Sequence, residues 1–138
     1  MTRSTHAVRG ALLAATALLA VGLVPAQAAP RQTIPDNWLY LTVTTGDTRS
    51  NDTRGTLLLC DPPQGHVRAV QACEELRAVQ GDISRIPLSA DAVCPMIYAP
   101  VTVSARGEWS GRRIEYGRTF ANSCVMRAET RAVFALAG

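Results

Sequence analysis

The sequence is poor in several of the residues that mark large functional classes. It contains no lysine, only 5% of its 138 residues are aromatic, and its formal net charge is +3. A charge this small argues against a strongly basic protein that binds nucleic acid. The chain has a single long apolar run, so it is not a membrane protein with several spans. Because 47% of the residues are hydrophobic, it is also not a long disordered chain.

The familiar signatures of catalysis and of metal binding are missing as well. No G-x-S-x-G, H-E-x-x-H, P-loop or G-x-G-x-x-G pattern occurs, and no C-x-x-C pattern indicates a zinc site. His66 is the only histidine beyond the first 28 residues, and it lies on a predicted loop beside Gly65. We therefore expect a protein that is not an enzyme and that needs neither a metal nor a cofactor.

The first 28 residues are typical of a secretory signal peptide. Arg3 and Arg9 give a positive start, residues 11–24 are apolar, and Ala26-Gln27-Ala28 is an A-x-A cleavage site. As a helix, the apolar run would span ~21 Å, which is shorter than the ~30 Å hydrocarbon core of a membrane. We expect a secreted protein that leaves the membrane after cleavage. Its predicted parts are a signal peptide at 1–28, a flexible N-terminal leader at 29–37 and one domain at 38–138.

Four cysteines in a short exported chain predict two disulfides. Four cysteines allow three pairings, and the spacing favours Cys60–Cys73 with Cys94–Cys124. Cys60 closes an apolar strand, and Cys73 lies on a predicted helix just across a short loop that contains proline and glycine. The favoured pairs close loops of 14 and 31 residues.

Alternating and helical patterns along the chain predict an α+β fold. Strand-like alternation occurs in five segments, at 38–45, 54–60, 101–109, 113–120 and 131–136. A main helix is predicted over 67–79, ended by Gly81, and a short second helix over 121–128. The main helix is predicted from apolar residues that recur every three positions, namely Val67, Val70, Cys73, Leu76 and Val79, and Ala69 and Ala72 add to the same side. The order of these elements predicts a single antiparallel five-stranded sheet packed by the two helices.

One segment stands out from these patterns. Residues 93–101 read Val-Cys-Pro-Met-Ile-Tyr-Ala-Pro-Val, so two prolines bracket four side chains, three of them large and apolar. Proline stiffens the backbone into an extended form, and large apolar side chains on a stiff exposed loop indicate a binding surface. Alternatively, Met96 and Ile97 are core residues of a strand that leads into Val101. The residue pattern alone leaves both interpretations open.

The same segment carries a resemblance to a known family. It rests first on Cys94-Pro95-Met96-Ile97-Tyr98, on Pro100-Val101 and on the cysteine spacing. Matching residues extend along the chain at Cys60, Pro62, Gly65, His66, Ala72, Cys73, Leu76, Gly81, Asp82, Trp109, Gly111, Arg113, Tyr116, Phe120, Asn122, Cys124, Val133 and Phe134. Over nearly all of residues 38–136 the chain resembles the secreted subtilisin-inhibitor-like family of streptomycetes. One departure lies at Val93, where a longer methionine is common in the family.

The resemblance implies an inhibitor of subtilisin-like serine proteases with a reactive bond between Met96 and Ile97. The unbranched, apolar side chain of Met96 also suits the S1 pockets of chymotrypsin-like enzymes. Met96 would fill the S1 pocket of the protease. The other residues that would contact the protease are Val93, Cys94 and Pro95 before the bond and Ile97 and Tyr98 after it. The resemblance also implies the two disulfides named above and a homodimer built through sheet faces. From its place beside Cys124, we expect the Asn122 amide to hydrogen-bond to the loop backbone and support it.

The alternative is another role on the same scaffold, either as an extracellular binding protein or as a transglutaminase substrate. Without lysine, the chain can offer a transglutaminase no acyl acceptor. The glutamines that could serve as donors are Gln32, Gln64, Gln71 and Gln80.

Overall fold

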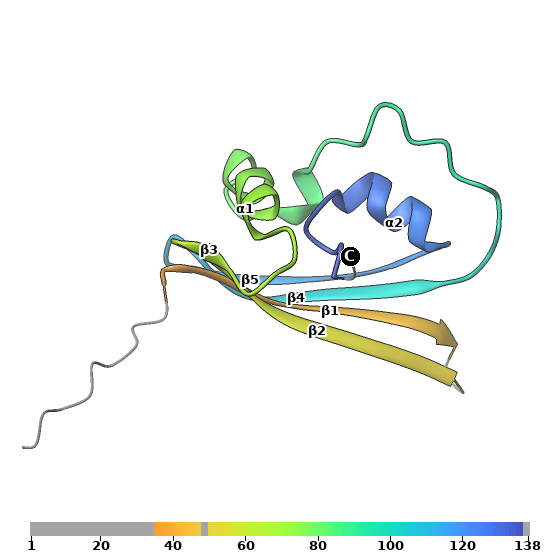
Figure 1. The fold of residues 1–138 in the computed structure, drawn as a ribbon, viewed down its shortest axis with the longest axis horizontal. Coiled ribbons are helices and arrows are strands. Elements are labelled where there is room, and N and C mark those ends of the chain that lie inside the picture. Colours follow the sequence, from red (N-terminus) through yellow and green to blue (C-terminus); the bar gives the residue numbers. More distant parts are fainter. Residues whose placement is uncertain (1–34, 48–49, 137–138) are drawn as a thin grey trace, which may run out of the picture. The chain divides into compact units, whose positions relative to one another are not determined.

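The computed structural model describes residues 35–47 and 50–136 (Figure 1). The predicted signal peptide and most of the predicted leader lie outside the described residues. Within the described residues, no helix is long and apolar enough to cross a membrane.

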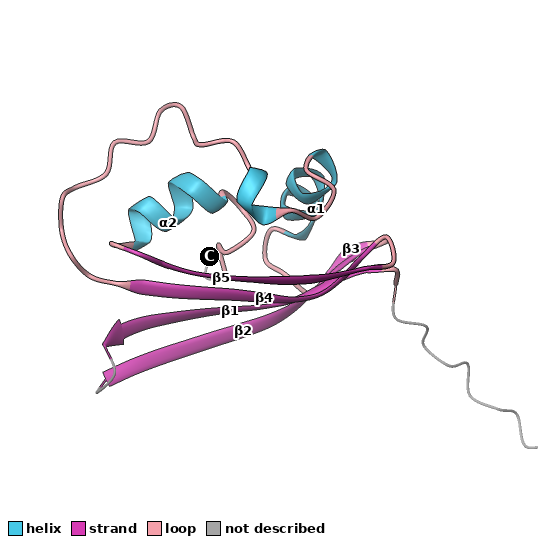
Figure 2. Cartoon of the chain, turned by 180° about the vertical axis from the view of Figure 1, so that it is seen from behind, coloured by secondary structure: helices cyan, strands magenta, loops and turns pink. Residues whose placement is uncertain are grey.

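The described residues form one antiparallel sheet with helices on one of its faces (Figure 2). Its five strands are β1 (Asn37–Asp47), β2 (Ser50–Cys60), β3 (Pro63–Gln64), β4 (Val101–Trp109) and β5 (Arg112–Phe120). They lie side by side in the order β3-β2-β1-β4-β5. The α+β class and the five-stranded antiparallel sheet are therefore confirmed.

The identity of the fifth strand differs from the prediction. Residues 131–136 form turns and irregular structure, and the two-residue strand β3 lies at the sheet edge instead. Arg131 has a φ of 52°, which turns the chain away from an extended path. The Val133 and Ala135 amides then bond to the carbonyls of residues 130 and 132, so their hydrogen bonds are made locally rather than to a neighbouring strand. The apolar residues of this segment fill the core: Ala132, Val133 and Phe134.

Three helical elements complete the fold. The helix α1 (Ala69–Ala78) and the single-turn 3₁₀ helix η1 (Ile83–Arg85) lie between β3 and β4 along the chain, and α2 (Ser123–Thr130) follows β5. The prediction for α1 was wrong at its start and for two of the residues placed on its buried side. Val67 precedes the helix and Val70 lies on its exposed side, 62% and 61% exposed. An α-helix repeats every 3.6 residues, so a strict spacing of three drifts off one face. The buried residues of α1 follow spacings of three and four, and all of them lie on the predicted side: Ala69, Ala72, Cys73 and Leu76.

Gly81 lies at the end of α1 as predicted, where it completes the bonds that end the helix and where its own conformation and surroundings require glycine. The Gly81 amide bonds to the Leu76 carbonyl at 2.8 Å, and the Gln80 amide bonds to the Arg77 carbonyl at 3.1 Å, which is the Schellman pattern. Gly81 has a φ of +80°, and a Cβ there would lie 2.5 Å from the Trp109 ring. A larger residue would therefore strain the backbone and push the indole out of the core.

The core fills the space between the inner face of the sheet and the helices. Alternate residues of β1, β2 and β4 point into it and are almost fully buried: Leu39, Leu41, Leu58, Val101, Val103 and Ala105. Leu39 pairs with Leu58 across β1 and β2, which places both on the same face. The Cys60–Cys73 disulfide joins the end of β2 to α1, and both sulfurs lie within this core.

Candidate functional site

The residues with the most exposed apolar side chains are in the long loop between η1 and β4, which arches away from the sheet (Figure 1). We call residues 93–98 the exposed segment. Val93 is 94% exposed, Met96 104% and Tyr98 81%. The segment is neither helix nor strand, so the alternative that Met96 and Ile97 are core residues of a strand is wrong. Large apolar side chains held in solvent indicate a binding surface.

Asn122 supports the backbone of the exposed segment from below. Its Nδ2 donates to the Pro95 carbonyl at 3.1 Å and to the Ile97 carbonyl at 2.8 Å. Its Oδ1 accepts from the Val125 amide at 3.0 Å, so the same side chain caps the first turn of α2. Asn122 is only 7% exposed. One buried amide therefore holds the carbonyls on both sides of Met96.

Two further contacts hold the segment at its ends. The Cys94–Cys124 disulfide joins its start to the first turn of α2. Just past its end, the Ala99 amide donates to the Ala121 carbonyl at 2.8 Å. Together with Asn122, these contacts come from one short piece of chain, and we call its residues Ala121, Asn122 and Cys124 the platform. The peptide bond between Met96 and Ile97 thus lies between two tethered ends.

The local sequence explains why this segment stays extended. Pro95 fixes its own φ and disfavours the helical region for Cys94, and Pro100 does the same for Ala99. Proline also offers no amide to a neighbouring strand, which disfavours a place for this segment inside the sheet. Asn122 sits at a φ of −163° and a ψ of 172°, the extended geometry of a helix N-cap.

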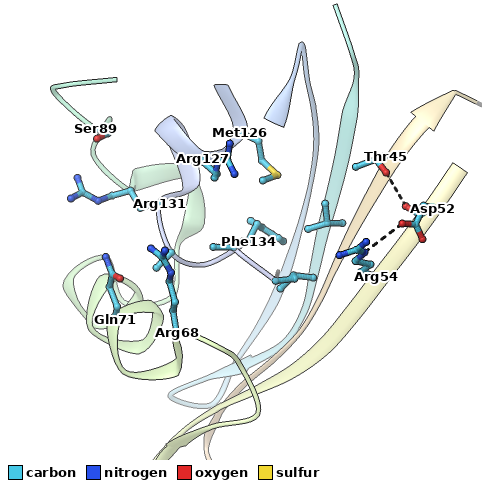
Figure 3. Close-up of a pocket in the computed structure, with 14 residues that line it drawn as sticks. Thr45, Asp52, Arg54, Arg68, Gln71, Ser89, Met126, Arg127, Arg131 and Phe134 are labelled. Atoms are coloured by element: carbon cyan, nitrogen blue, oxygen red, sulfur yellow. Dashed lines mark hydrogen bonds and ion pairs between the residues drawn. The ribbon is translucent and has the colours of Figure 1, made fainter. Parts of the chain in front are cut away.

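A cavity of about 410 Å³ lies elsewhere, between the sheet and the two α-helices (Figure 3). Arginines gather around it, and one of them, Arg54, pairs with Asp52 at 3.4 Å. Phe134 and Met126 contribute apolar surface. No residue of the exposed segment lines this cavity. The segment is therefore a projecting surface, suited to enter a cleft on a partner rather than to enclose a ligand.

His66, the one histidine of the described residues, lies at the start of α1, outside the exposed segment. Its Nδ1 accepts from the Arg68 amide at 2.9 Å. Burial lowers the pKa of His66, and an interaction with the Val133 backbone partly opposes that shift. Among residues 35–47 and 50–136, no group of three or more His, Cys, Asp or Glu side chains could hold a metal ion.

Comparison with known proteins places this chain in a family. The family model described as "Subtilisin inhibitor-like" matches residues 36–122. The chain belongs to the subtilisin inhibitor-like family. Its members are protease inhibitors and not enzymes.

Individual relatives agree with this membership. A predicted serine protease inhibitor of Streptomyces avermitilis is 59% identical over 136 residues, which cover 99% of this chain and 90% of the relative. A subtilisin inhibitor of Streptomyces albogriseolus is 40% identical over 111 residues, covering 78% of this chain and 77% of its own. Sermetstatin of Streptomyces caespitosus, solved in complex with Bacillus licheniformis subtilisin, is similar in structure with a TM-score of 0.55. It is 32% identical, and the match covers 72% of this chain and 99% of sermetstatin.

Sequence reasoning found most of the residues that the structure brings together here, including Asn122 and the Cys94–Cys124 pair. It missed Ala121, which acts through its backbone carbonyl, because every residue type carries that group. No signal in the sequence distinguishes Ala121 from the other alanines.

Proposed function

We propose that this protein is a secreted inhibitor of subtilisin-like serine proteases that binds the protease active site through the exposed segment. One observation carries the proposal above all others. The Met96 side chain is fully exposed, while the carbonyls before and after it are fixed by a single buried amide. A protease needs an extended, accessible chain at the bond it attacks, and this segment is held in that form before binding. Little conformational entropy is then lost on association.

Each residue of the segment has a proposed place in the protease. Met96 fills the S1 pocket as the buried anchor, with the Met96–Ile97 bond at the catalytic serine. The Met96 carbonyl points into the oxyanion hole. Residues 93–95 pair with the protease backbone as an added strand, and Ile97 and Tyr98 contact the far side of the bond.

The tethers give the reason why such a segment would inhibit rather than be digested. If the protease cuts after Met96, the new carboxyl end remains tied by the Cys94–Cys124 disulfide and by the Asn122 bond to Pro95. The new amino end remains tied by the bonds to Ile97 and Ala99. Both ends stay in place, so the amine attacks the acyl-enzyme again before water does, and the bond re-forms.

The side chain of Met96 sets the proposed specificity. Methionine is unbranched, flexible and apolar, and it suits the apolar S1 pockets of subtilisin-like and chymotrypsin-like enzymes. The S1 pocket of trypsin carries an aspartate and prefers a positive side chain. Trypsin is therefore expected to be inhibited weakly.

We also propose that two copies of the chain associate through the outer face of the sheet. Two apolar side chains on neighbouring strands of that face remain accessible, Tyr40 at 49% and Leu57 at 41%, and they pair across β1 and β2. Hydroxyl pairs continue the face, such as Thr44 with Thr53 at 2.9 Å. A sheet face with accessible apolar side chains and a polar surround can pack against a second copy of itself.

Export is proposed from two independent features. Residues 1–28 carry the pattern of a signal peptide, and all four cysteines of the chain are joined in disulfides. Disulfides persist in oxidising compartments outside the cytoplasm.

Titration of subtilisin with the mature protein, residues 29–138, tests the inhibitory function. We expect activity to fall in a stoichiometric manner and mass spectrometry to find slow cleavage at the Met96–Ile97 bond alone. Loss of inhibition on full reduction of the disulfides would support the tethering mechanism. Absence of inhibition at equimolar concentration, with the protein shown to be folded, would overturn the proposal and favour a binding protein on the same scaffold.

A further inference from the structure

We infer that the ion pair between Arg118 and Glu129 is a positioning device for the exposed segment, because it fixes the corner between β5 and α2 that carries the platform. The inference rests on the proposed inhibitory function. The ion pair lies outside the residues proposed to contact the protease, and its effect is to slow cleavage of the Met96–Ile97 bond.

The platform makes the four contacts described above with the exposed segment and with Ala99, which follows it. These are the Cys94–Cys124 disulfide, the two bonds from Asn122 and the bond to the Ala121 carbonyl. Any tilt of the platform would therefore move both ends of the Met96–Ile97 bond. The orientation of the platform is set where it joins the fold.

That junction is a corner between a strand and a helix. β5 ends at Phe120, and α2 begins at Ser123. Arg118 lies on the strand before the corner and Glu129 on the last turn of the helix after it. Their Nη1 and Oε2 atoms are 2.5 Å apart. The pair thus closes a loop of chain that contains the whole platform.

The surroundings of the pair make it more than a surface contact. The Glu129 side chain is only 24% exposed, which reduces its screening by water, while that of Arg118 is 51% exposed. The guanidinium carbon of Arg118 lies 4.8 Å from the centre of the Phe120 ring. Phe120 is 3% exposed and directly precedes Ala121. Arg118 therefore links the buried end of β5 to α2.

A third group faces Arg118 from the same strand. Burial raises the pKa of Tyr116, and the positive charge of Arg118 opposes that rise. The Tyr116 ring stacks on Phe134 at 6.1 Å between centres, so it joins the corner to the core. A planar guanidinium can bind a carboxylate while it stacks on a ring, and a lysine ammonium cannot reproduce both contacts.

The rate at which subtilisin hydrolyses the Met96–Ile97 bond within the 1:1 complex tests this inference. We expect Arg118→Ala to raise that rate by about tenfold, equivalent to ~1.4 kcal/mol, since it removes one partly exposed ion pair and one cation–π contact. Glu129→Gln should raise it less, because the contact with Phe120 remains. The exchanged pair, Arg118→Glu with Glu129→Arg, should restore part of the resistance.

A matched control lies at the other end of the sheet. Arg77 pairs with Asp61 at 3.1 Å and donates to the Cys60 carbonyl at 2.7 Å, beside the other disulfide. Arg77→Ala should lower the melting temperature without changing the hydrolysis rate. Hydrogen exchange of the Ala99 amide in the free inhibitor should quicken in Arg118→Ala and stay unchanged in Arg77→Ala.

The outcomes separate the two proposals. If the wild-type protein fails to inhibit subtilisin, the proposed function is wrong. If the wild type inhibits but Arg118→Ala and Glu129→Gln are hydrolysed at the wild-type rate, only the positioning inference is overturned. Equal acceleration by Arg77→Ala would also overturn it, because a general loss of stability would then explain the effect.

Discussion

The two ends of the sheet each carry one disulfide, yet they differ in what the disulfide holds. At one end, Cys60–Cys73 joins β2 to α1, and both residues are fully buried. At the other, Cys94–Cys124 joins an exposed loop to α2, and both residues are partly exposed. Strand register places these ends apart, since Trp38 pairs with Leu59 while Thr45 pairs with Val101. The same covalent link thus supports the core at one end and the proposed binding surface at the other.

Asparagines repeat this contrast between the ends. Asn37 donates to Asp61 at 2.7 Å and accepts from the Ser110 amide at 2.8 Å, which ties strands and turns together. Asn122 donates to two carbonyls of the exposed segment and accepts from the first turn of α2. The first set of bonds stays within the body of the fold, and the second set preorganises a loop that has no core of its own. Preorganisation therefore depends on where a polar side chain points, not on its type.

Removal of one disulfide or the other should give the largest difference in effect between the two ends. Cys94→Ala with Cys124→Ala should raise the hydrolysis rate of the Met96–Ile97 bond by about 100-fold, because the new carboxyl end is no longer held. Cys60→Ala with Cys73→Ala should leave that rate near wild type. In the chain-entropy model the two removals cost about 3.7 and 3 kcal/mol of stability, so stability alone does not distinguish them.

Mass spectrometry of each complex over time measures this hydrolysis, at a temperature where circular dichroism shows both variants to be folded. Similar cleavage rates in the two variants would contradict the proposed functional difference between the ends.

A change of the anchor residue Met96 should change which protease is inhibited. Met96→Lys should gain trypsin inhibition by at least about 100-fold, because the lysine charge meets the aspartate in the S1 pocket of trypsin. Val70→Lys is the control, as Val70 is 61% exposed on α1 and lies outside the segment. Inhibition constants for trypsin and subtilisin measure both variants. Unchanged trypsin inhibition in Met96→Lys would count against Met96 as the anchor.

A smaller change should expose the role of the Asn122 donors. Asn122→Asp keeps the acceptor that caps α2 and loses the two donors to the exposed segment. We expect hydrolysis to quicken by about 30-fold, since two hydrogen bonds of ~1 kcal/mol each are lost. Asn37→Asp is the matched variant at the other end, and it should lower the melting temperature with no change in hydrolysis. If both variants are cleaved at the wild-type rate, the amide of Asn122 does not protect the bond.

The smallest effect is expected from pH at the α1 side. Burial holds the pKa of His66 below its usual value of 6.5, so the unfolded chain binds more protons as the pH falls through that value. The stability contributed by neutral His66 is complete above the unfolded pKa and decreases below it. Thermal melts between pH 5 and 8 should show this dependence in the wild type and less of it in His66→Gln.

The inhibition constant should remain the same in His66→Gln at every pH of that series. A parallel loss of inhibition would mean that the two ends of the sheet are coupled.

Some features of the fold follow from local sequence pattern. β4 has the predicted limits because its residues alternate cleanly between buried and exposed. The hairpin of β1 and β2 forms as expected, although both strands run further toward the turn. The strand predicted at residues 131–136 is absent for a physical reason. Three consecutive buried residues there fill the space between the sheet and the helices. A segment buried on all sides carries no alternation of apolar and polar residues.

The exposed segment was visible in the sequence for the opposite reason. Residues 93–98 fit neither the period of a helix nor that of a strand, and two prolines keep them out of both. The support beneath them was only partly visible. Asn122 has a polar side chain next to a cysteine, so a role could be proposed for it, whereas Arg118 and Glu129 look like ordinary exposed charges along the chain.

The sequence by itself determined the α+β class, the two disulfides and the stiffness of one apolar loop. The disulfides follow from the number and spacing of the cysteines. These depend on residue types and on short-range periodicity, which the chain carries in its order. The tertiary structure decided which strand completes the sheet and which groups hold the loop. Asn122 meets the Pro95 carbonyl across 27 residues, and Ala121 acts through its backbone. Contacts between distant residues, and contacts made by the backbone, exist only once the chain has folded.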